Sequence, residues 1–130
     1  MGRDLVERYP QAKALFEKAN AIVGYDLQQL CFAGPEDKLN ATTVSQPAIF
    51  TVSAALLEVF RESGITADVT AGLSMGEYTA LYAAGLISFE DGLKLVQQRG
   101  NAMQAAADAT EGSMVSLLGL DEVKVIELCE

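Results

Sequence analysis

The 130-residue sequence contains no histidine and only two cysteines. Without an imidazole, a reaction that needs a histidine as general base cannot be completed by these residues alone. Cys31 and Cys129 stand far apart and form no Cys-x-x-Cys pair, so we expect two buried structural thiols and no metal site. No apolar run approaches the ~20 residues of a membrane span, and the acidic N-terminal segment is unlike a signal peptide. We therefore expect a cytoplasmic protein with no membrane partner.

Basic residues are also scarce. Nine Lys and Arg residues stand against 18 Asp and Glu residues, which gives a net charge of −9. Because the basic residues are not clustered, binding to a phosphate backbone is disfavoured and we expect no nucleic-acid partner. Half of the residues are hydrophobic and only three are proline, which is typical of one small globular domain with a real core.

Helical periodicity and helix-end signals predict where the helices lie in the first half of the chain. We expect helices over residues 4–9, 10–23 and 27–32, then an irregular polar segment over 36–45. Pro47 lacks an amide hydrogen, which favours a place in the first turn of the next helix and a cap near Ser45. That helix ends at Gly64. Its predicted apolar face consists of Ile49, Val52, Leu56, Val59 and Phe60.

Two short strands are predicted in the second half, over residues 68–72 and 113–118. The first leads into a helix over 75–84. Ser88 begins a capping box and a helix that runs to about residue 108, and Asp121 caps a final helix. Because a lone strand cannot form a sheet, the pattern suggests that partner strands lie outside these residues.

Residues 72–76 read Gly-Leu-Ser-Met-Gly and match the pattern G-x-S-x-G. A strand before the motif and a helix after it are the setting of a nucleophile elbow, in which a serine sits on a strained turn. Ser74 is the candidate nucleophile. The backbone N–H of Met75, the next residue, is the candidate oxyanion donor. The alternative is an ordinary glycine-rich turn in which Ser74 caps the helix.

Arg99 interrupts the apolar side of the predicted helix that starts at Ser88. Polar residues gather on the opposite face, whereas Arg99 falls between Val96 and Met103. A guanidinium in such a place needs an anionic partner, because an unpaired buried charge is costly. The partner could be a substrate, or a carboxylate of the protein. Alternatively, the stem could be buried while the head reaches solvent.

The longer segment 71–81, Ala-Gly-Leu-Ser-Met-Gly-Glu-Tyr-Thr-Ala-Leu, resembles the active-site segment of malonyl-CoA:acyl-carrier-protein transacylases, whose usual form is G-H-S-L-G-E-Y/F. The resemblance covers essentially the whole chain and includes residues 43–48, 85–92 and 112–115, and Arg99 with Met103. Leu73 stands where the family most often has histidine. That position flanks the nucleophile and is not the catalytic base, so the departure concerns local tuning.

The resemblance implies an α/β fold. Residues 1–111 would be an incomplete α/β-hydrolase-like acyltransferase core, mostly helical, with a short strand leading to the nucleophile elbow. Residues 112–130 would begin a small ferredoxin-like subdomain. The implied reaction, in fatty acid biosynthesis, transfers malonyl from malonyl-CoA to the phosphopantetheine thiol of acyl carrier protein through malonyl-Ser74. Arg99 would bind the free carboxylate of malonate and Gln46 would assist near the oxyanion, with no cofactor and no metal.

Two parts of the family's site have no counterpart in these residues. They are a G-Q-G-x-Q loop whose glutamine backbone completes the oxyanion hole, and a downstream catalytic histidine. We therefore expect a truncated transacylase that is poorly active and poorly soluble alone. The alternatives are another serine enzyme such as an esterase or thioesterase, part of the acyltransferase domain of a polyketide synthase, and a non-catalytic remnant.

Overall fold

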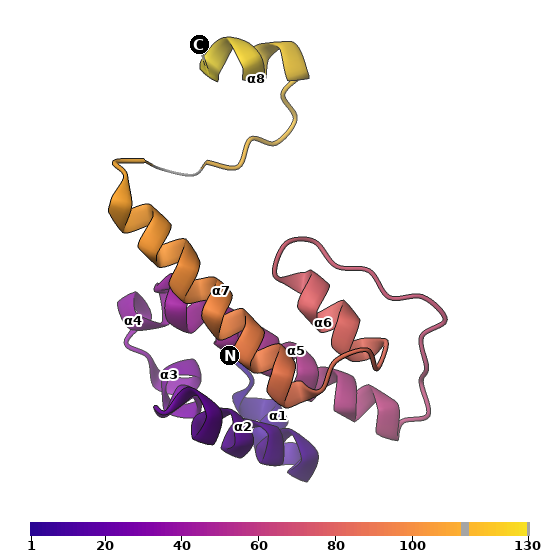
Figure 1. Ribbon diagram of the computed structural model, residues 1–130. Coiled ribbons are helices and arrows are strands. Elements are labelled where there is room, and N and C mark those ends of the chain that lie inside the picture. Colours follow the sequence, from indigo (N-terminus) through magenta and orange to yellow (C-terminus); the bar gives the residue numbers. More distant parts are fainter. Residues whose placement is uncertain (113–114, 130) are drawn as a thin grey trace.

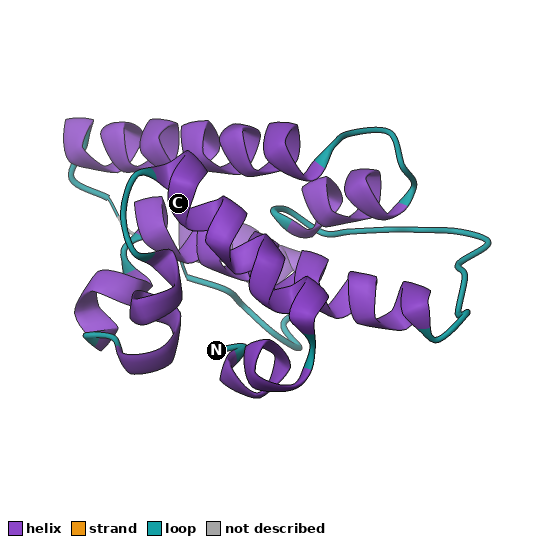
Figure 2. Ribbon diagram, turned by 90° about the horizontal axis from the view of Figure 1, so that it is seen from below, coloured by secondary structure: helices purple, strands orange, loops and turns teal. Residues whose placement is uncertain are grey.

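The computed structural model describes residues 1–112 and 115–129, and every regular element in these ranges is a helix (Figures 1 and 2). In chain order the helices are α1 (Arg3–Arg8), α2 (Pro10–Val23), α3 (Leu27–Ala33), α4 (Glu36–Asn40), α5 (Thr42–Glu62), α6 (Gly76–Ala83), α7 (Phe89–Ala109) and α8 (Glu122–Cys129). Helices α2, α5 and α7 pack together, with α1, α3 and α4 at one side and α6 against α5 and α7.

Local end signals place most helix boundaries as predicted. Pro10 is the first residue of α2, and Gly24 ends that helix with a φ of 81°. Asp26 caps α3 by accepting a hydrogen bond from the Gln29 N–H. Ser88 caps α7 by accepting from the Asp91 N–H at 3.0 Å. Pro10 lacks the amide that a helix start would leave free, and the other three residues bond a free backbone group, so each signal acts without help from distant residues.

The prediction for the start of α5 is wrong. Residues 36–45 are not irregular, because α4 occupies part of them and α5 already begins at Thr42. The residue at the cap is Ala41 rather than Ser45, and Pro47 lies inside the helix beyond its first turn. An interior proline removes one helical hydrogen bond and costs ~3 kcal/mol in an exposed helix. Here Pro47 is fully buried, so its packing in the core offsets that loss.

The predicted apolar face of α5 is also wrong. Its buried side consists of Gln46, Pro47, Ala48, Phe50, Thr51, Ala54 and Ala55. Ile49, Leu56 and Phe60 of the predicted face are 42%, 40% and 51% exposed. The small residues of the buried side let α2 and α7 approach closely, whereas periodicity alone could not choose between two apolar faces. Contrary to expectation, α5 is long and apolar enough to cross a membrane by length and composition, but this is weak evidence for a helix packed against α2 and α7.

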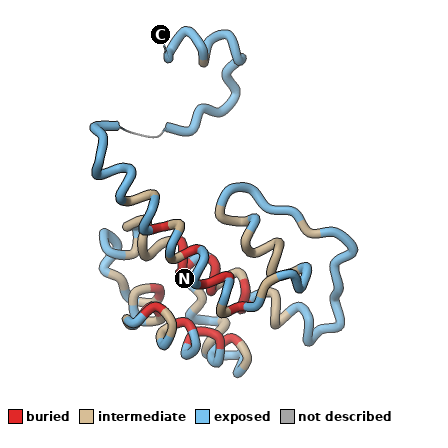
Figure 3. The backbone as a smooth tube through the Cα atoms, viewed as in Figure 1, coloured by how far each residue is buried: buried red, intermediate tan, exposed pale blue. Residues whose placement is uncertain are grey.

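The core lies between α2, α5 and α7, where the buried residues concentrate (Figure 3). Phe50 of α5 stacks on Phe89 of α7 at 5.7 Å between ring centroids, and Tyr82 of α6 meets both rings edge-on. At the other end of the α5–α7 contact, a Cβ on Gly100 would lie only 2.9 Å from the Thr42 carbonyl oxygen. This glycine therefore allows the two helices to cross closely where Arg99 meets α5.

Neither predicted strand forms in the described residues. Residues 66–72 form a long exposed loop between α5 and α6, in which Val69 is 85% exposed, and residues 115–118 are also without a strand. Residues 113–114 of the second prediction lie outside the described residues. The physical reason is that a strand is stabilised by a neighbouring strand, and β-branched composition alone does not supply one.

The C-terminal helix α8 forms where the Asp121 signal places it, with the Val125 N–H bonded to the Asp121 carbonyl at 3.2 Å. It lies apart from the other helices, and every described residue of it except Val125 is exposed (Figures 1 and 3). Cys31 is buried as expected, but the expectation for Cys129 is wrong because this thiol is exposed on α8. The proposed division at residue 112 stays a prediction.

Candidate active site

Residues 72–76 form a sharp turn directly before α6. Ser74 has a φ of 56° and is the only non-glycine residue with positive φ in the described part of the chain. A non-glycine residue held in this region costs about 1–3 kcal/mol. A Cβ on Gly72 would lie 2.1 Å from the Gly76 carbonyl oxygen, so the turn requires glycine at position 72. The Gly76 N–H donates to the Leu73 carbonyl at 2.9 Å and closes the turn.

The alternative of a plain cap does not hold. The cap position of α6 is Met75, and no side chain makes a capping hydrogen bond there. Within the described residues, the Met75 N–H donates to no backbone carbonyl. It stands at the N-terminal end of an eight-residue helix, where free amides and the helix dipole favour negative charge. The geometry is therefore suited to an oxyanion beside the Ser74 hydroxyl.

The structure brings Arg99 to Ser74 across 25 residues of sequence. Arg99 lies on α7, and its Nη2 donates to the Ser74 Oγ at 2.9 Å. Its Nη1 donates to the Gln46 Oε1 on α5 at 2.6 Å. The turn and two helices thus meet at one guanidinium.

Among the described residues, the hydrogen-bond partners of Arg99 are neutral. The described residues form three salt bridges, which join Lys13 to Glu17, Lys18 to Glu90 and Arg61 to Glu58, and none includes Arg99. The alternative in which a protein carboxylate satisfies the guanidinium is therefore absent from the described contacts. A half-buried cation beside a serine, with no carboxylate partner in the described part of the chain, can receive an anionic substrate group through two parallel hydrogen bonds.

Gln46 is buried, with 6% of its surface exposed. Its Oε1 accepts from Arg99, and its Nε2 donates to the Met103 Sδ at 3.3 Å. The amide therefore acts on the guanidinium, and both of its ends have partners. Sequence reasoning did not assign Met103 a role at the site. Its spacing of four residues from Arg99 on one helix was the signal that could have found it.

A proton acceptor for Ser74 is not found among the described residues. Arg99 is the sole side chain there with a hydrogen bond to the Ser74 Oγ, and a guanidinium cannot accept a proton. No group of three or more His, Cys, Asp or Glu side chains that could hold a metal ion occurs in the same part of the chain. The arrangement can position a hydroxyl, an oxyanion and a carboxylate, but it does not itself remove the hydroxyl proton.

Residues 1–128 match the family model described as the acyl transferase domain. The chain belongs to the acyl transferase family. It is 48% identical over 121 residues to the malonyl CoA-acyl carrier protein transacylase of Bacillus subtilis (strain 168), covering 93% of this chain and 38% of that protein. The resemblance read from the motifs is therefore confirmed. The chain resembles the N-terminal part of these transacylases.

Two further comparisons extend the family match. The malonyl CoA-acyl carrier protein transacylase structure of Coxiella burnetii superposes with a TM-score of 0.91 at 36% identity, covering 99% of this chain and 41% of that one. The polyketide biosynthesis protein ThaF of Burkholderia thailandensis is 46% identical over 129 residues, covering 98% of this chain and 11% of that protein. This acyl transferase chain thus spans about two fifths of the length of the transacylases.

Proposed function

We propose that Ser74 accepts a malonyl group from malonyl-CoA and passes it to the phosphopantetheine thiol of an acyl carrier protein, in fatty acid biosynthesis. The observation that carries this proposal is the 2.9 Å contact between the Arg99 Nη2 and the Ser74 Oγ. A cation next to the nucleophile suits a short acyl group that ends in a carboxylate. The relatives from Bacillus subtilis (strain 168) and Escherichia coli (strain K12) are named as malonyl CoA-acyl carrier protein transacylases, which supports the same substrate and partner.

Arg99 would have two successive partners. In the free protein it holds the Ser74 hydroxyl, and when malonyl binds, its Nη groups pair with the free carboxylate. The Gln46 amide keeps the guanidinium in place while the carboxylate replaces Ser74 as its partner. It can do so because the Gln46 Oε1 accepts a hydrogen bond from the Arg99 Nη1. Acetyl-CoA would leave the guanidinium facing a methyl group, so the same contact discriminates against it.

The proposed reaction proceeds in two halves. The Ser74 oxygen adds to the thioester carbonyl carbon and gives its proton to a general base, which forms a tetrahedral intermediate. The carbon–sulfur bond then breaks, and the base returns the proton so that coenzyme A leaves as its thiol. The Met75 N–H stabilises the oxyanion of the tetrahedral intermediate. The thiol of the carrier protein's phosphopantetheine then attacks malonyl-Ser74 and releases the serine hydroxyl. This chemistry uses no metal or cofactor.

The proton of Ser74 needs an acceptor that these 130 residues do not provide as a histidine. We propose that the base and a second oxyanion donor come from polypeptide outside them. A general base contributes ~10²–10⁴-fold and one oxyanion donor about 10²–10³-fold, so the chain alone would be nearly inactive.

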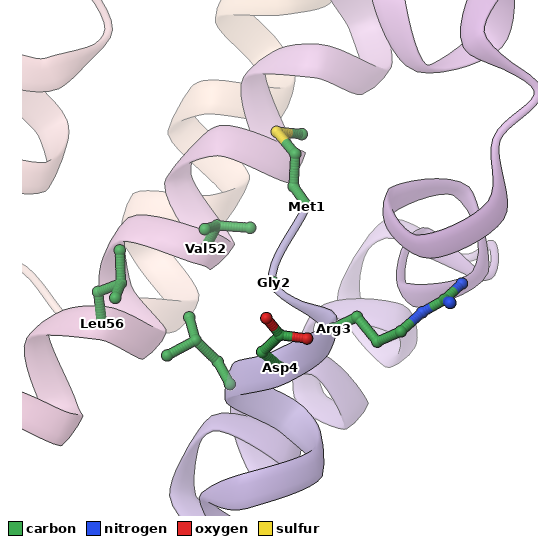
Figure 4. Close-up of a pocket in the computed structure, with 7 residues that line it drawn as sticks. Met1, Gly2, Arg3, Asp4, Val52 and Leu56 are labelled. Carbon is green, nitrogen blue, oxygen red and sulfur yellow. The ribbon is translucent and has the colours of Figure 1, made fainter.

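The exposed side of α5 supports the proposal that further polypeptide completes the site. Beside its exposed apolar residues lies a hollow of about 420 Å³ against the N-terminal segment (Figure 4), lined by Met1, Gly2, Arg3, Asp4, Leu5, Val52 and Leu56. Exposed apolar surface of this kind marks an interaction site. Residues 1–111 would then be part of a larger α/β acyltransferase core and residues 112–130 the start of a second subdomain, in a cytoplasmic enzyme.

The test compares acyl loading of Ser74 in a complete acyl transferase, made by joining this chain to the remaining part of a transacylase relative. Loading with malonyl-CoA and with acetyl-CoA is followed by intact mass. Arg99→Ala removes hydrogen bonds to a charged group, and one such bond of about 1.5–3 kcal/mol corresponds to about 10–100-fold, so the malonyl-to-acetyl ratio falls at least about tenfold. Lys94→Ala, which removes an exposed charge from the same helix, leaves the ratio unchanged. An unaltered ratio in Arg99→Ala would refute the role of Arg99.

A second candidate is an acyltransferase unit of polyketide synthesis, favoured by the 46% identity to ThaF. It would use the same Ser74 and Arg99 but could accept a malonyl group with a substituent on its central carbon. Competition between malonyl-CoA and methylmalonyl-CoA in the same loading assay separates the two. Preferential loading of methylmalonyl would favour the second candidate.

A further inference from the structure

Two side chains of α5 form hydrogen bonds with the C-terminal end of α6. The Tyr82 hydroxyl donates to the Glu58 Oε1 at 2.7 Å, and the Arg61 Nη1 donates to the same oxygen at 2.6 Å. The Arg61 Nη2 donates to the Ala83 carbonyl at 3.1 Å, and the guanidinium lies 5.2 Å from the centroid of the Tyr82 ring. We name Glu58, Arg61 and Tyr82 the α6 clamp.

The remaining packing of α6 is partial, with Met75 and Tyr78 half-buried against the core. No residue of this helix is fully buried. The Tyr82 ring meets Phe50 and Phe89 edge-on at 6.1 and 6.2 Å, and the Thr70 hydroxyl donates to the Ala80 carbonyl at 3.0 Å. Among the described residues, the side-chain hydrogen bonds to α6 all lie in the second half of the helix. The directional contacts that fix α6 along its own axis therefore lie in the half of the helix that holds the clamp.

The opposite end of α6 follows the strained turn that carries Ser74. A non-glycine residue with positive φ persists only when its surroundings over-determine its conformation. A short helix is stiff, with a rise of ~1.5 Å per residue, so a displacement of Tyr82 reaches Ser74 about 12 Å away. Relaxation of the turn would move the Ser74 Oγ away from the Arg99 guanidinium.

We propose that the α6 clamp is the device that positions Ser74, holding the strained turn at the distance from Arg99 that the reaction needs. Glu58, Arg61 and Tyr82 are thus positioning residues that touch no substrate and act through α6. The inference rests on the proposed role of Ser74 as nucleophile. It goes beyond that role by assigning the geometry of the site to side chains at the far end of the helix.

The test is amide hydrogen exchange in the full 130-residue chain. The reporters are the N–H groups of Gly76, Glu77 and Tyr78, which donate across the turn at 2.9–3.2 Å. The variants are Tyr82→Phe, which keeps the ring, and Arg61→Ala. In both, exchange of these amides becomes about tenfold faster relative to amides of α2. This factor is expected when the free energy of local opening falls by the value of one hydrogen bond.

Glu62→Ala is the matched control. It removes a side-chain hydrogen bond of α5 to α2, from the Gln11 Nε2 at 2.6 Å, without touching α6. In this variant, the exchange rate of the turn amides relative to that of the α2 amides stays unchanged or falls, because the lost hydrogen bond belongs to α2. Arg61→Lys, which keeps the pair with Glu58, restores part of the protection. Equal exchange at the turn in wild type, Tyr82→Phe and Arg61→Ala overturns the proposal.

A second measurement separates positioning from stability. In the complete acyl transferase, the clamp variants lower kcat for malonyl loading and leave KM unchanged, because the carboxylate contact of Arg99 is intact. A higher KM with unchanged kcat would contradict the proposal. Because exchange needs no substrate, failure of the wild-type enzyme to load malonyl would reject the proposed function while the exchange result still decides on the clamp.

Discussion

Gly100→Ala tests how closely α5 and α7 cross beside the candidate site. An added Cβ would lie 2.9 Å from the Thr42 carbonyl oxygen and 3.2 Å from the Thr43 Cα. These are backbone atoms, so no side-chain rotation can relieve the overlap and the two helices must separate. Overpacking of this kind costs about 1–3 kcal/mol.

Helix propensity acts in the opposite direction. Alanine is favoured over glycine in a helix interior by about 1 kcal/mol. The two terms therefore predict a net loss of about 0–2 kcal/mol in the free energy of unfolding. The separation also lengthens the 2.6 Å contact between Arg99 and Gln46, since Arg99 directly precedes Gly100 on α7.

Urea unfolding of the wild type, Gly100→Ala and two controls measures this balance. Asn101→Ala raises propensity at an exposed position of α7, and we expect a gain of about 0.5 kcal/mol. Gly112→Ala adds a Cβ with no heavy atom within 4 Å, and we expect a change within about 1 kcal/mol in the stabilising direction. If Gly100→Ala is more stable than the wild type by the full propensity difference, the close crossing is refuted.

Three further predictions concern titration, thiol reactivity and solubility. Burial, and then the hydrogen bond to the Glu58 carboxylate, raise the pKa of Tyr82 from 10.0 to about 12. Folding therefore favours the protonated hydroxyl, so the free energy of unfolding falls between pH 10 and pH 12, and Tyr82→Phe should flatten this fall in melting experiments. Cys129 should react with a thiol reagent at once and Cys31 only on unfolding, since burial encloses Cys31 and raises its pKa; equal rates would contradict the structure. Phe60→Lys should change stability by less than about 0.5 kcal/mol and reduce self-association in sedimentation experiments, because its ring is half exposed.

The helix ends could be predicted because their signals are local. Pro10, Gly24 and Ser88 each decide a boundary through their own φ preference or side-chain oxygen, and the structure confirms all three. The start of α5 could not be predicted in this way. Its proline is tolerated inside the helix by packing against other helices, which no local signal announces.

The predictions of the buried face of α5 and of the two strands failed for a related reason. Ile49 and Ala48 are both apolar, and periodicity does not say which of them faces α2 and α7. Residues 68–72 have the composition of a strand, but a strand requires a partner at the right distance. Both outcomes depend on residues far away in the sequence.

The sequence by itself determined the chemistry available to this acyl transferase chain. The glycines around Ser74 allow one strained turn, and a single arginine interrupts an apolar helix side, because both patterns follow from the backbone of a few consecutive residues. Only the tertiary structure decided that Arg99 reaches Ser74 and Gln46, which lie 25 and 53 residues away. The physical reason is that the crossing of α5 and α7 and the placement of α6 are set by packing between helices, which a helical period does not encode.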